Sequence, residues 1–151
     1  MGRTAFLICV IAATVALSTV AASAQFGGGS LGSLGVSYAY SGDPDGARLE
    51  YTTSDFVIDG LYFKDDHRDS TIMGLEVGWK ASGAGVDLGA NSFVIGAGYY
   101  NDDPDVLPAD SGVGFWAGIG DFSTQRGLFY QFRYVFNGVI EGSQGILGWR
   151  F

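Results

Sequence analysis

The sequence is poor in several features on which other protein classes depend. Cysteine occurs once, at Cys9, so the residues after it can form neither a disulfide with one another nor a thiolate metal site. Proline occurs only three times among 151 residues. Lys and Arg number eight against sixteen Asp and Glu, and this acidic balance disfavours a nucleic-acid partner. After residue 24 there is no run of about eighteen apolar residues, which argues against a transmembrane helix there.

The N-terminal segment has the pattern of a secretory leader. Arg3 supplies a positive charge, an apolar run follows, and Ala22-Ser23-Ala24 gives the small-x-small pattern of a signal peptidase site. We therefore expect residues 1–24 to be a cleaved signal peptide and residues 25–32 to be a glycine-rich N-terminal lead. An uncleaved membrane anchor is the alternative, but the apolar run is short for a span and ends in small residues.

What the sequence does contain is glycine, with 25 residues, and aromatic residues, at 15%. Apolar side chains recur at every second position in segment after segment, which is the period of a β-strand. Asn137-Gly138 is a strong hairpin signal, and it predicts that Phe136 faces Val139 and that Leu128 pairs with Leu147. We predict eight strands within a single domain of residues 33–151, near 33–41, 47–53, 56–64, 71–81, 91–100, 112–121, 126–136 and 139–151.

The two faces of these strands differ in size and polarity. One face is large and apolar, whereas the other consists of glycines, small residues and a few long polar side chains. The interior of an eight-stranded barrel is too narrow for the large face, so that face must point outward, where only lipid stabilises it. The pattern predicts an all-β fold, an eight-stranded antiparallel up-and-down transmembrane β-barrel. A soluble sandwich or a lipocalin-like calyx would need the opposite arrangement.

Several charged residues fall on the predicted inner face. An unpaired buried charge costs several kcal/mol, so we expect them to pair across the lumen and to block continuous ion flow. Arg133 lies midway along its strand and is the expected partner of Glu76 or Glu50, whereas Arg150, near one mouth, is expected to stay hydrated. The inward glycines favour a narrow pore for small solutes instead, which the inward Trp116 opposes. The predicted lumen charge network comprises Arg48, Glu50, Asp59, Glu76, Lys80 and Arg133.

The leader, the alternating strands, the short turns and the final aromatic residue resemble the small outer-membrane barrels of the OmpA-domain and OmpX type. Leu147, Trp149 and Phe151 match the terminal pattern of that class, in which the outer-membrane assembly machinery recognises a final Phe. The resemblance implies a location in the cell outer membrane, contacts with outer-membrane lipid and lipopolysaccharide, and a monomer. Unlike OmpA, the chain is not expected to carry a periplasmic domain after its barrel.

Nine acidic residues cluster in three connections that face outward if both termini lie in the periplasm. They suit either a divalent-cation site or, as we favour, a solvated rim that shares the cations bridging lipopolysaccharide. No connection has the spacing of an EF-hand. The nine residues are Asp43, Asp45, Asp65, Asp66, Asp69, Asp102, Asp103, Asp105 and Asp110.

His67 and Ser70 are the only candidates for a nucleophile with its base. Their spacing is three residues, whereas the lipid A deacylases among eight-stranded barrels place Ser two residues after His. The glycine-rich segments 26–35 and 82–90 have neither the lysine nor the helix of a phosphate-binding loop, so no cofactor is predicted. We therefore expect a non-enzymatic membrane protein, with a narrow pore and a lipid-modifying enzyme as the alternatives.

Overall fold

The computed structural model describes residues 32–40, 44–67, 69–81, 92–104, 110–136 and 139–151. The predicted signal peptide, residues 25–31 of the predicted lead, Asn137-Gly138 and the glycine-rich connection at 82–90 lie outside the described residues. Nowhere in these ranges is there a helix of the length and hydropathy that a membrane crossing requires. The strands are β1 (Ser33–Tyr40), β2 (Asp45–Thr52), β3 (Phe56–Asp65), β4 (Ser70–Lys80), β5 (Ser92–Pro104), β6 (Asp110–Gly120), β7 (Gly127–Phe136) and β8 (Gly142–Arg150).

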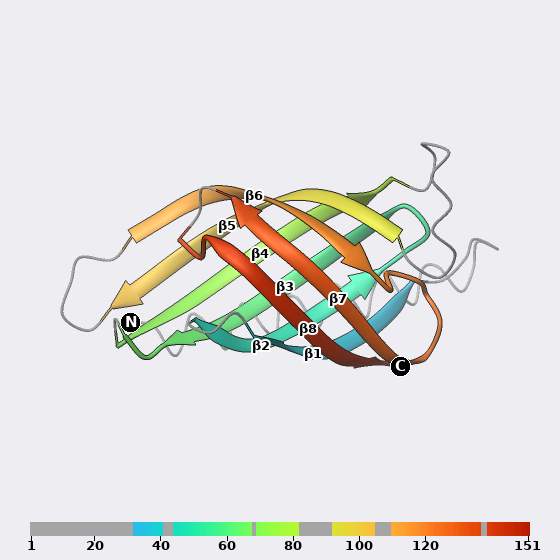
Figure 1. The fold of residues 1–151 in the computed structure, drawn as a ribbon, viewed down its shortest axis with the longest axis horizontal. Coiled ribbons are helices and arrows are strands. Elements are labelled where there is room, and N and C mark those ends of the chain that lie inside the picture. The colour runs from blue at the N-terminus through green and yellow to red at the C-terminus, as the bar shows by residue number, and fades with distance from the viewer. Residues whose placement is uncertain (1–31, 41–43, 68, 82–91, 105–109, 137–138) are drawn as a thin grey trace. The chain divides into compact units, whose positions relative to one another are not determined.

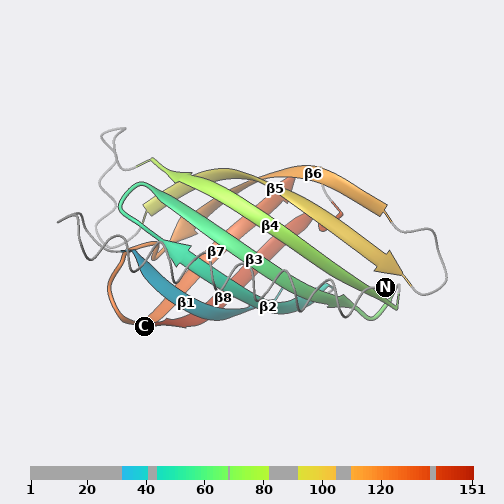
Figure 2. The same cartoon turned by 180° about the vertical axis from the view of Figure 1, so that it is seen from behind.

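The strands form one closed antiparallel barrel. Each pairs with its neighbours in sequence, and β1 pairs with β8 to close the ring of eight strands. The strands are inclined to the long axis of the barrel; β7 and β8 lie in front in Figure 1, and β2, β3 and β4 lie in front in the reverse view of Figure 2. The predicted fold class is therefore confirmed.

Strand ends differ from the prediction mainly at two hairpins. The β5–β6 hairpin is longer than expected, because Asn101–Pro104 and Asp110 belong to strands rather than to the connection. The predicted register of the β7–β8 hairpin is wrong by two residues: Leu128 pairs with Trp149 instead of Leu147. A shift of two keeps every side chain on its predicted face. It arises because Ile140 leaves the ladder to become buried, and β8 begins only at Gly142.

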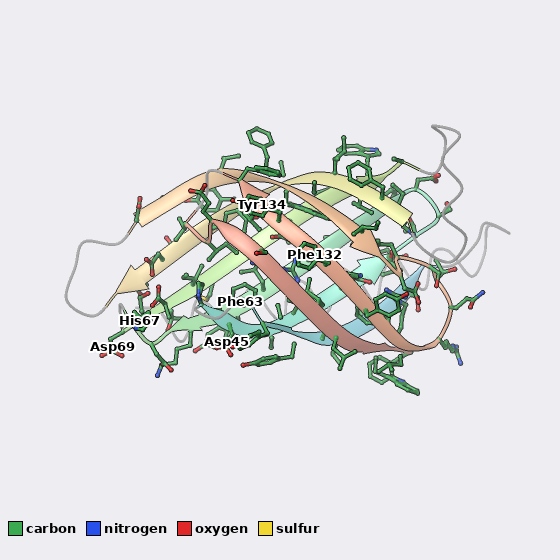
Figure 3. All side chains as sticks on the ribbon, viewed as in Figure 1. Asp45, Phe63, His67, Asp69, Phe132 and Tyr134 are labelled. Atoms are coloured by element: carbon green, nitrogen blue, oxygen red, sulfur yellow. The ribbon has the colours of Figure 1, made fainter. Side chains whose placement is uncertain are left out.

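The outer face of the barrel is apolar over almost all of its area. Large hydrophobic residues on every strand except β2 point outward and are exposed, with exposed fractions of 66% for Leu128 and 64% for Trp79. Phe132 and Tyr134 of β7 are two of these outward side chains, and both are labelled in Figure 3. The outward placement of the large face, which was predicted from its size, is confirmed.

The inner face contains more large rings than we expected. Tyr100, Trp116, Phe122 and Phe129 are all buried inside the barrel with the polar residues. Glycines on neighbouring strands make room for them: a Cβ atom at Gly78 would lie 2.4 Å from the Trp116 ring. Gly96 likewise faces Trp116, Gly74 and Gly98 face Tyr100, and Gly35 and Gly148 face Phe129. These inward glycines therefore lie beneath aromatic rings.

Candidate functional site in the barrel lumen

Three carboxylates lie side by side on one wall of the lumen. Glu50 of β2 pairs directly with Asp59 of β3, and Asp59 pairs directly with Glu76 of β4. Directly paired residues share a face of the sheet, so the three side chains point into the barrel in one row. All three are at most 1% exposed. A row of three buried like charges is strongly unfavourable unless cations face it.

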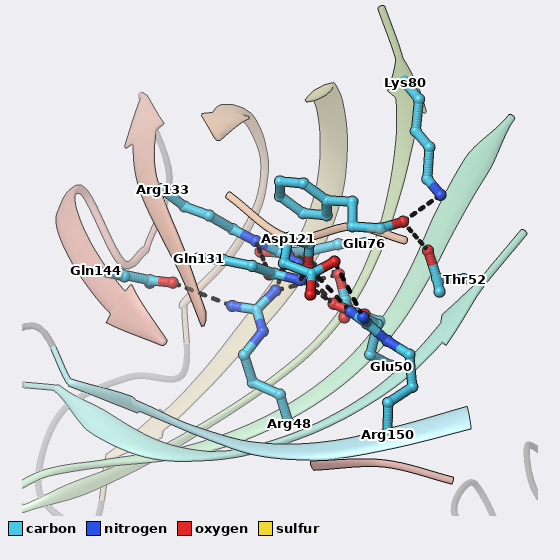
Figure 4. Close-up of polar contacts among 12 residues, drawn as sticks. Arg48, Glu50, Thr52, Glu76, Lys80, Asp121, Gln131, Arg133, Gln144 and Arg150 are labelled. Atoms are coloured by element: carbon cyan, nitrogen blue, oxygen red, sulfur yellow. Dashed lines mark hydrogen bonds and ion pairs between the residues drawn. The ribbon is translucent and has the colours of Figure 1, made fainter. Parts of the chain in front are cut away.

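Three arginines supply those cations, as Figure 4 shows. Arg133 of β7 reaches all three carboxylates, with Nη1 2.7 Å from Asp59 and 2.9 Å from Glu76, and Nη2 3.3 Å from Glu50. Arg48 pairs with Glu76 and lies 3.4 Å from Asp59. Arg150 Nη2 lies 2.6 Å from Glu50. Three arginines thus balance three carboxylates within the network.

Neutral side chains fill several further hydrogen-bonding positions, while Asp59 Oδ1, Arg48 Nε and Arg150 Nε have no partner among the described residues. Gln131 donates to Glu50 at 2.6 Å, while its carbonyl oxygen accepts from Arg133 at 2.6 and 3.1 Å. Arg48 donates to the Gln144 carbonyl oxygen at 3.0 Å, and the Tyr100 hydroxyl donates to Glu76 at 2.8 Å. The network therefore extends over β2, β3, β4, β5, β7 and β8. A buried polar network is stabilising when its members are hydrogen-bonded in this way.

Each lumen arginine also lies against an aromatic ring. The guanidinium carbon of Arg133 is 4.2 Å from the centroid of Trp116, and that of Arg150 is 4.1 Å from Phe129. Arg48 lies 6.0 Å from the Phe63 centroid. A planar guanidinium can stack on a ring while its edge binds carboxylates, which an ammonium cannot do. Sequence reasoning missed these ring partners, although Trp116 was recognised as a large residue at an inward position.

Two of the charged residues do not lie where we expected. Lys80 does not contact the carboxylate row; its ammonium donates to the backbone carbonyls of Thr53 and Phe122. The expectation that Arg150 stays hydrated is wrong, because its side chain is fully buried. It also donates to the Asp121 carbonyl at 3.1 Å. The reason for both is that the turn between β6 and β7 folds inward over this end of the lumen.

The last residues of the chain complete the barrel seam. The Phe151 amide donates to the Leu34 carbonyl at 2.8 Å, and Ser33 Oγ donates to the Phe151 carbonyl at 3.1 Å. The side chains of Leu147, Trp149 and Phe151 all point outward and are more than half exposed, at 58%, 52% and 58%. They form one apolar stripe beside β1, at the end of the barrel that carries the C-terminus.

His67 and Ser70 are not brought together as a catalytic pair. His67 lies exposed in the β3–β4 turn with Asp69, at the end of the barrel opposite the C-terminus (Figure 3). Ser70 points inward and is 2% exposed, and within the described residues its hydroxyl has no hydrogen-bond partner. Among the same residues, no group of three His, Cys, Asp or Glu side chains is arranged to hold a metal ion.

A closed eight-stranded barrel with an apolar exterior and charged residues inside has the architecture of a membrane-spanning β-barrel. No family model matches the sequence, and no curated protein matches it. The N-terminal β-barrel domain of Pseudomonas aeruginosa OprF superposes with a TM-score of 0.54 at 15% identity, over 79% of this chain and 97% of that one. Ail, the attachment invasion locus protein of Yersinia pestis, gives a TM-score of 0.34 at 13% identity, over 80% and 97%. The OprF similarity shows that the chain has the eight-stranded fold of small outer-membrane barrels.

Proposed function

We propose that this protein is a non-enzymatic, monomeric barrel of the cell outer membrane with a lumen closed to ions. Its role is structural, or lies in presenting short acidic turns at the cell surface. The observation that carries the proposal is the contrast between the apolar outer face and the paired charges inside. Such an outer face is unfavourable in water and stable in lipid, and a closed barrel leaves no strand edge unpaired there.

The orientation follows from the even number of strands. In barrels of this class both chain ends lie on the periplasmic side, so the C-terminal end of this barrel faces the periplasm. The opposite end, with Asp66 and Asp69 exposed on the β3–β4 turn, then faces the cell exterior. An acidic rim at that level suits contact with lipopolysaccharide through shared divalent cations, which prefer carboxylate oxygens.

The charge network supports a closed lumen. A permeating ion would have to displace part of a network in which Arg133 alone binds three carboxylates. Breaking a buried ion pair leaves an uncompensated charge, which is strongly unfavourable. The pore alternative drew its support from the inward glycines, and these lie beneath Trp116, Tyr100 and Phe129.

The arrangement at Ser70 supports a non-enzymatic role. A serine nucleophile requires a base within hydrogen-bonding reach and a path for the substrate. Ser70 is buried and its hydroxyl lacks a hydrogen-bond partner in the described part of the chain, while His67 lies exposed on the turn.

Electrical recording and a lipid assay on the same preparation test the proposal. We expect refolded protein in planar bilayers to show no steady conductance, and to release no fatty acid from phospholipid or lipid A. A wide-pore barrel inserted into identical bilayers verifies that conductance is detectable. A persistent open conductance would overturn the closed lumen, and fatty-acid release that scales with protein would overturn the non-enzymatic role. A chain that stays folded in water without detergent or lipid would contradict the membrane location itself.

A further inference from the structure

The turn between β6 and β7 does not project away from the barrel. Within residues 121–126, Asp121 and Phe122 turn into the C-terminal mouth, and the Phe122 side chain is completely buried, while Gln125 and Arg126 are exposed. The turn is flanked by Gly120 with φ 148° and Gly127 with φ 128°, values that other residues rarely adopt. These two glycines let the chain leave β6 inward and re-enter β7. We call residues 121–126 the strap.

Hydrogen bonds fasten the strap to the opposite wall. The Phe122 carbonyl accepts from the Lys80 ammonium and, at 3.2 Å, from the Thr52 hydroxyl. Both donors converge on this one oxygen in Figure 4. Lys80 also donates to the Thr53 carbonyl in the β2–β3 turn, which is four strands away from the strap around the ring. The lysine therefore joins two turns across the width of the mouth.

The strap is also tied to the charge network. The Phe122 ring lies 5.4 Å from the Arg133 guanidinium, in space that Gly118 leaves free. The Asp121 carbonyl accepts from Gln131 at 3.3 Å and from Arg150 at 3.1 Å. Phe122 thus separates the paired charges from the solvent at the C-terminal mouth.

We propose that the strap is the seal of the periplasmic mouth, that Lys80 and Thr52 latch it, and that the lumen opens first by release of this latch. The proposal rests on the orientation and closed lumen proposed above. Lys80 is held by neutral carbonyls, whereas each lumen arginine is held by a carboxylate, and ionic partners make the stronger hydrogen bonds. Apart from the Arg150–Asp121 ion pair at 3.5 Å, the strap is held by neutral partners, so its Lys80–Thr52 latch is the part of the closure that gives way before the arginine network does.

A buried cysteine reports on the seal. Val57 points inward on β3, is fully buried and pairs with Thr52, so Val57→Cys lies just behind the strap. In a Cys9→Ser background, this thiol should react slowly with a membrane-impermeant methanethiosulfonate in the latched protein. Adding Lys80→Met and Thr52→Val removes both donors while roughly keeping side-chain size. We expect the reaction to become at least about tenfold faster, because the strap loses one charged and one neutral hydrogen bond.

Matched variants decide the interpretation. Arg126→Met removes a positive charge from the same turn, but Arg126 is exposed, so the Val57→Cys rate should not change. A reporter at Ile72→Cys, buried toward the other end of β4, should stay unreactive in the latch variant. If the double variant fails to fold, Thr52→Val alone serves, with a smaller acceleration expected. The proposed role of the strap would be overturned if the Val57→Cys thiol reacted equally fast with and without the latch residues, or if Arg126→Met accelerated the reaction as much as the latch variant. Steady conductance of the unmodified protein would instead overturn the closed lumen, so the two failures are distinguishable.

Discussion

At the scale of single residues, the arginines decide how the lumen is filled. The Arg133 guanidinium stacks its flat face on Trp116 and directs its edge to three carboxylates. The stacking and the ion pairs therefore fix the same planar group. The sequence predicted that Arg133 points inward, because the period of a strand assigns faces. It could not predict that Trp116 stacks on Arg133, or that Lys80 donates hydrogen bonds to backbone carbonyls. Those contacts depend on the height of each residue along the barrel axis, and the alternation of side chains along a strand does not determine that height.

Replacing Arg133 by alanine tests the central ion pairs. We expect Arg133→Ala to leave three carboxylates facing only Arg48 and Arg150, and the resulting unbalanced buried charge to lower the free energy of unfolding by about 3 kcal/mol or more. Urea unfolding in lipid vesicles measures the loss. Arg126→Ala removes an exposed arginine from a turn and should change stability by less than about 0.5 kcal/mol.

A double variant separates ion pairing from packing at the same position. Arg133→Met combined with Asp59→Asn removes one charge of each sign and keeps much of the volume. It should unfold with a smaller loss than Arg133→Met alone, since fewer carboxylates remain unbalanced. Equal losses for the single and double variants would mean that Arg133 stabilises the barrel mainly by packing on Trp116.

At the scale of the strands, alternation predicted the faces well and the hairpin ends less well. Both faces of β7 are as its sequence indicated, because strict alternation of large and polar residues allows only one assignment. The predicted β7–β8 register was wrong: the Asn-Gly signal led us to start the last strand at Val139, whereas Ile140 is buried outside the ladder and β8 begins at Gly142. The sequence showed that glycines face inward, but not that they make room for aromatic rings. The Trp116 ring that covers Gly78 comes from β6, which is distant in sequence.

Adding a methyl group at an inward and at an outward glycine tests this account of the interior. Gly78→Ala would place its Cβ 2.4 Å from the Trp116 ring and 2.7 Å from Val94, so we expect a loss of about 1–3 kcal/mol in unfolding free energy. Gly60→Ala is the matched control, because nothing lies within 4 Å of its Cβ position. It should be neutral or slightly stabilising. Similar losses at both positions would mean that Trp116 is not tightly packed against Gly78.

At the scale of the whole molecule, the fold could be predicted because one face of the strands carries large side chains and the other carries mostly small or polar ones. An eight-stranded barrel cannot enclose the large face, and this one constraint fixed both the outward apolar belt and the inward charges. What it could not supply was the turn that we propose closes the C-terminal mouth. The strap depends on positive φ at Gly120 and Gly127 and on a lysine from across the barrel, and no local pattern marks that combination.

The apolar stripe of Leu147, Trp149 and Phe151 allows folding of the barrel to be distinguished from its delivery to the membrane. Phe151 and Tyr40 are both outward aromatic side chains, 58% and 64% exposed, at opposite ends of the barrel. Alanine at either position removes a comparable apolar area from contact with lipid, so both variants should fold alike in detergent, as gel mobility before and after boiling would show. If the assembly machinery recognises the stripe of Leu147, Trp149 and Phe151, only Phe151→Ala should lower the amount of barrel in outer membranes, by severalfold in membrane fractions. The main-chain bonds of Phe151 to β1 remain in that variant, so the closed seam itself is not tested. Equal membrane levels of the two variants would leave the stripe as part of the lipid belt alone.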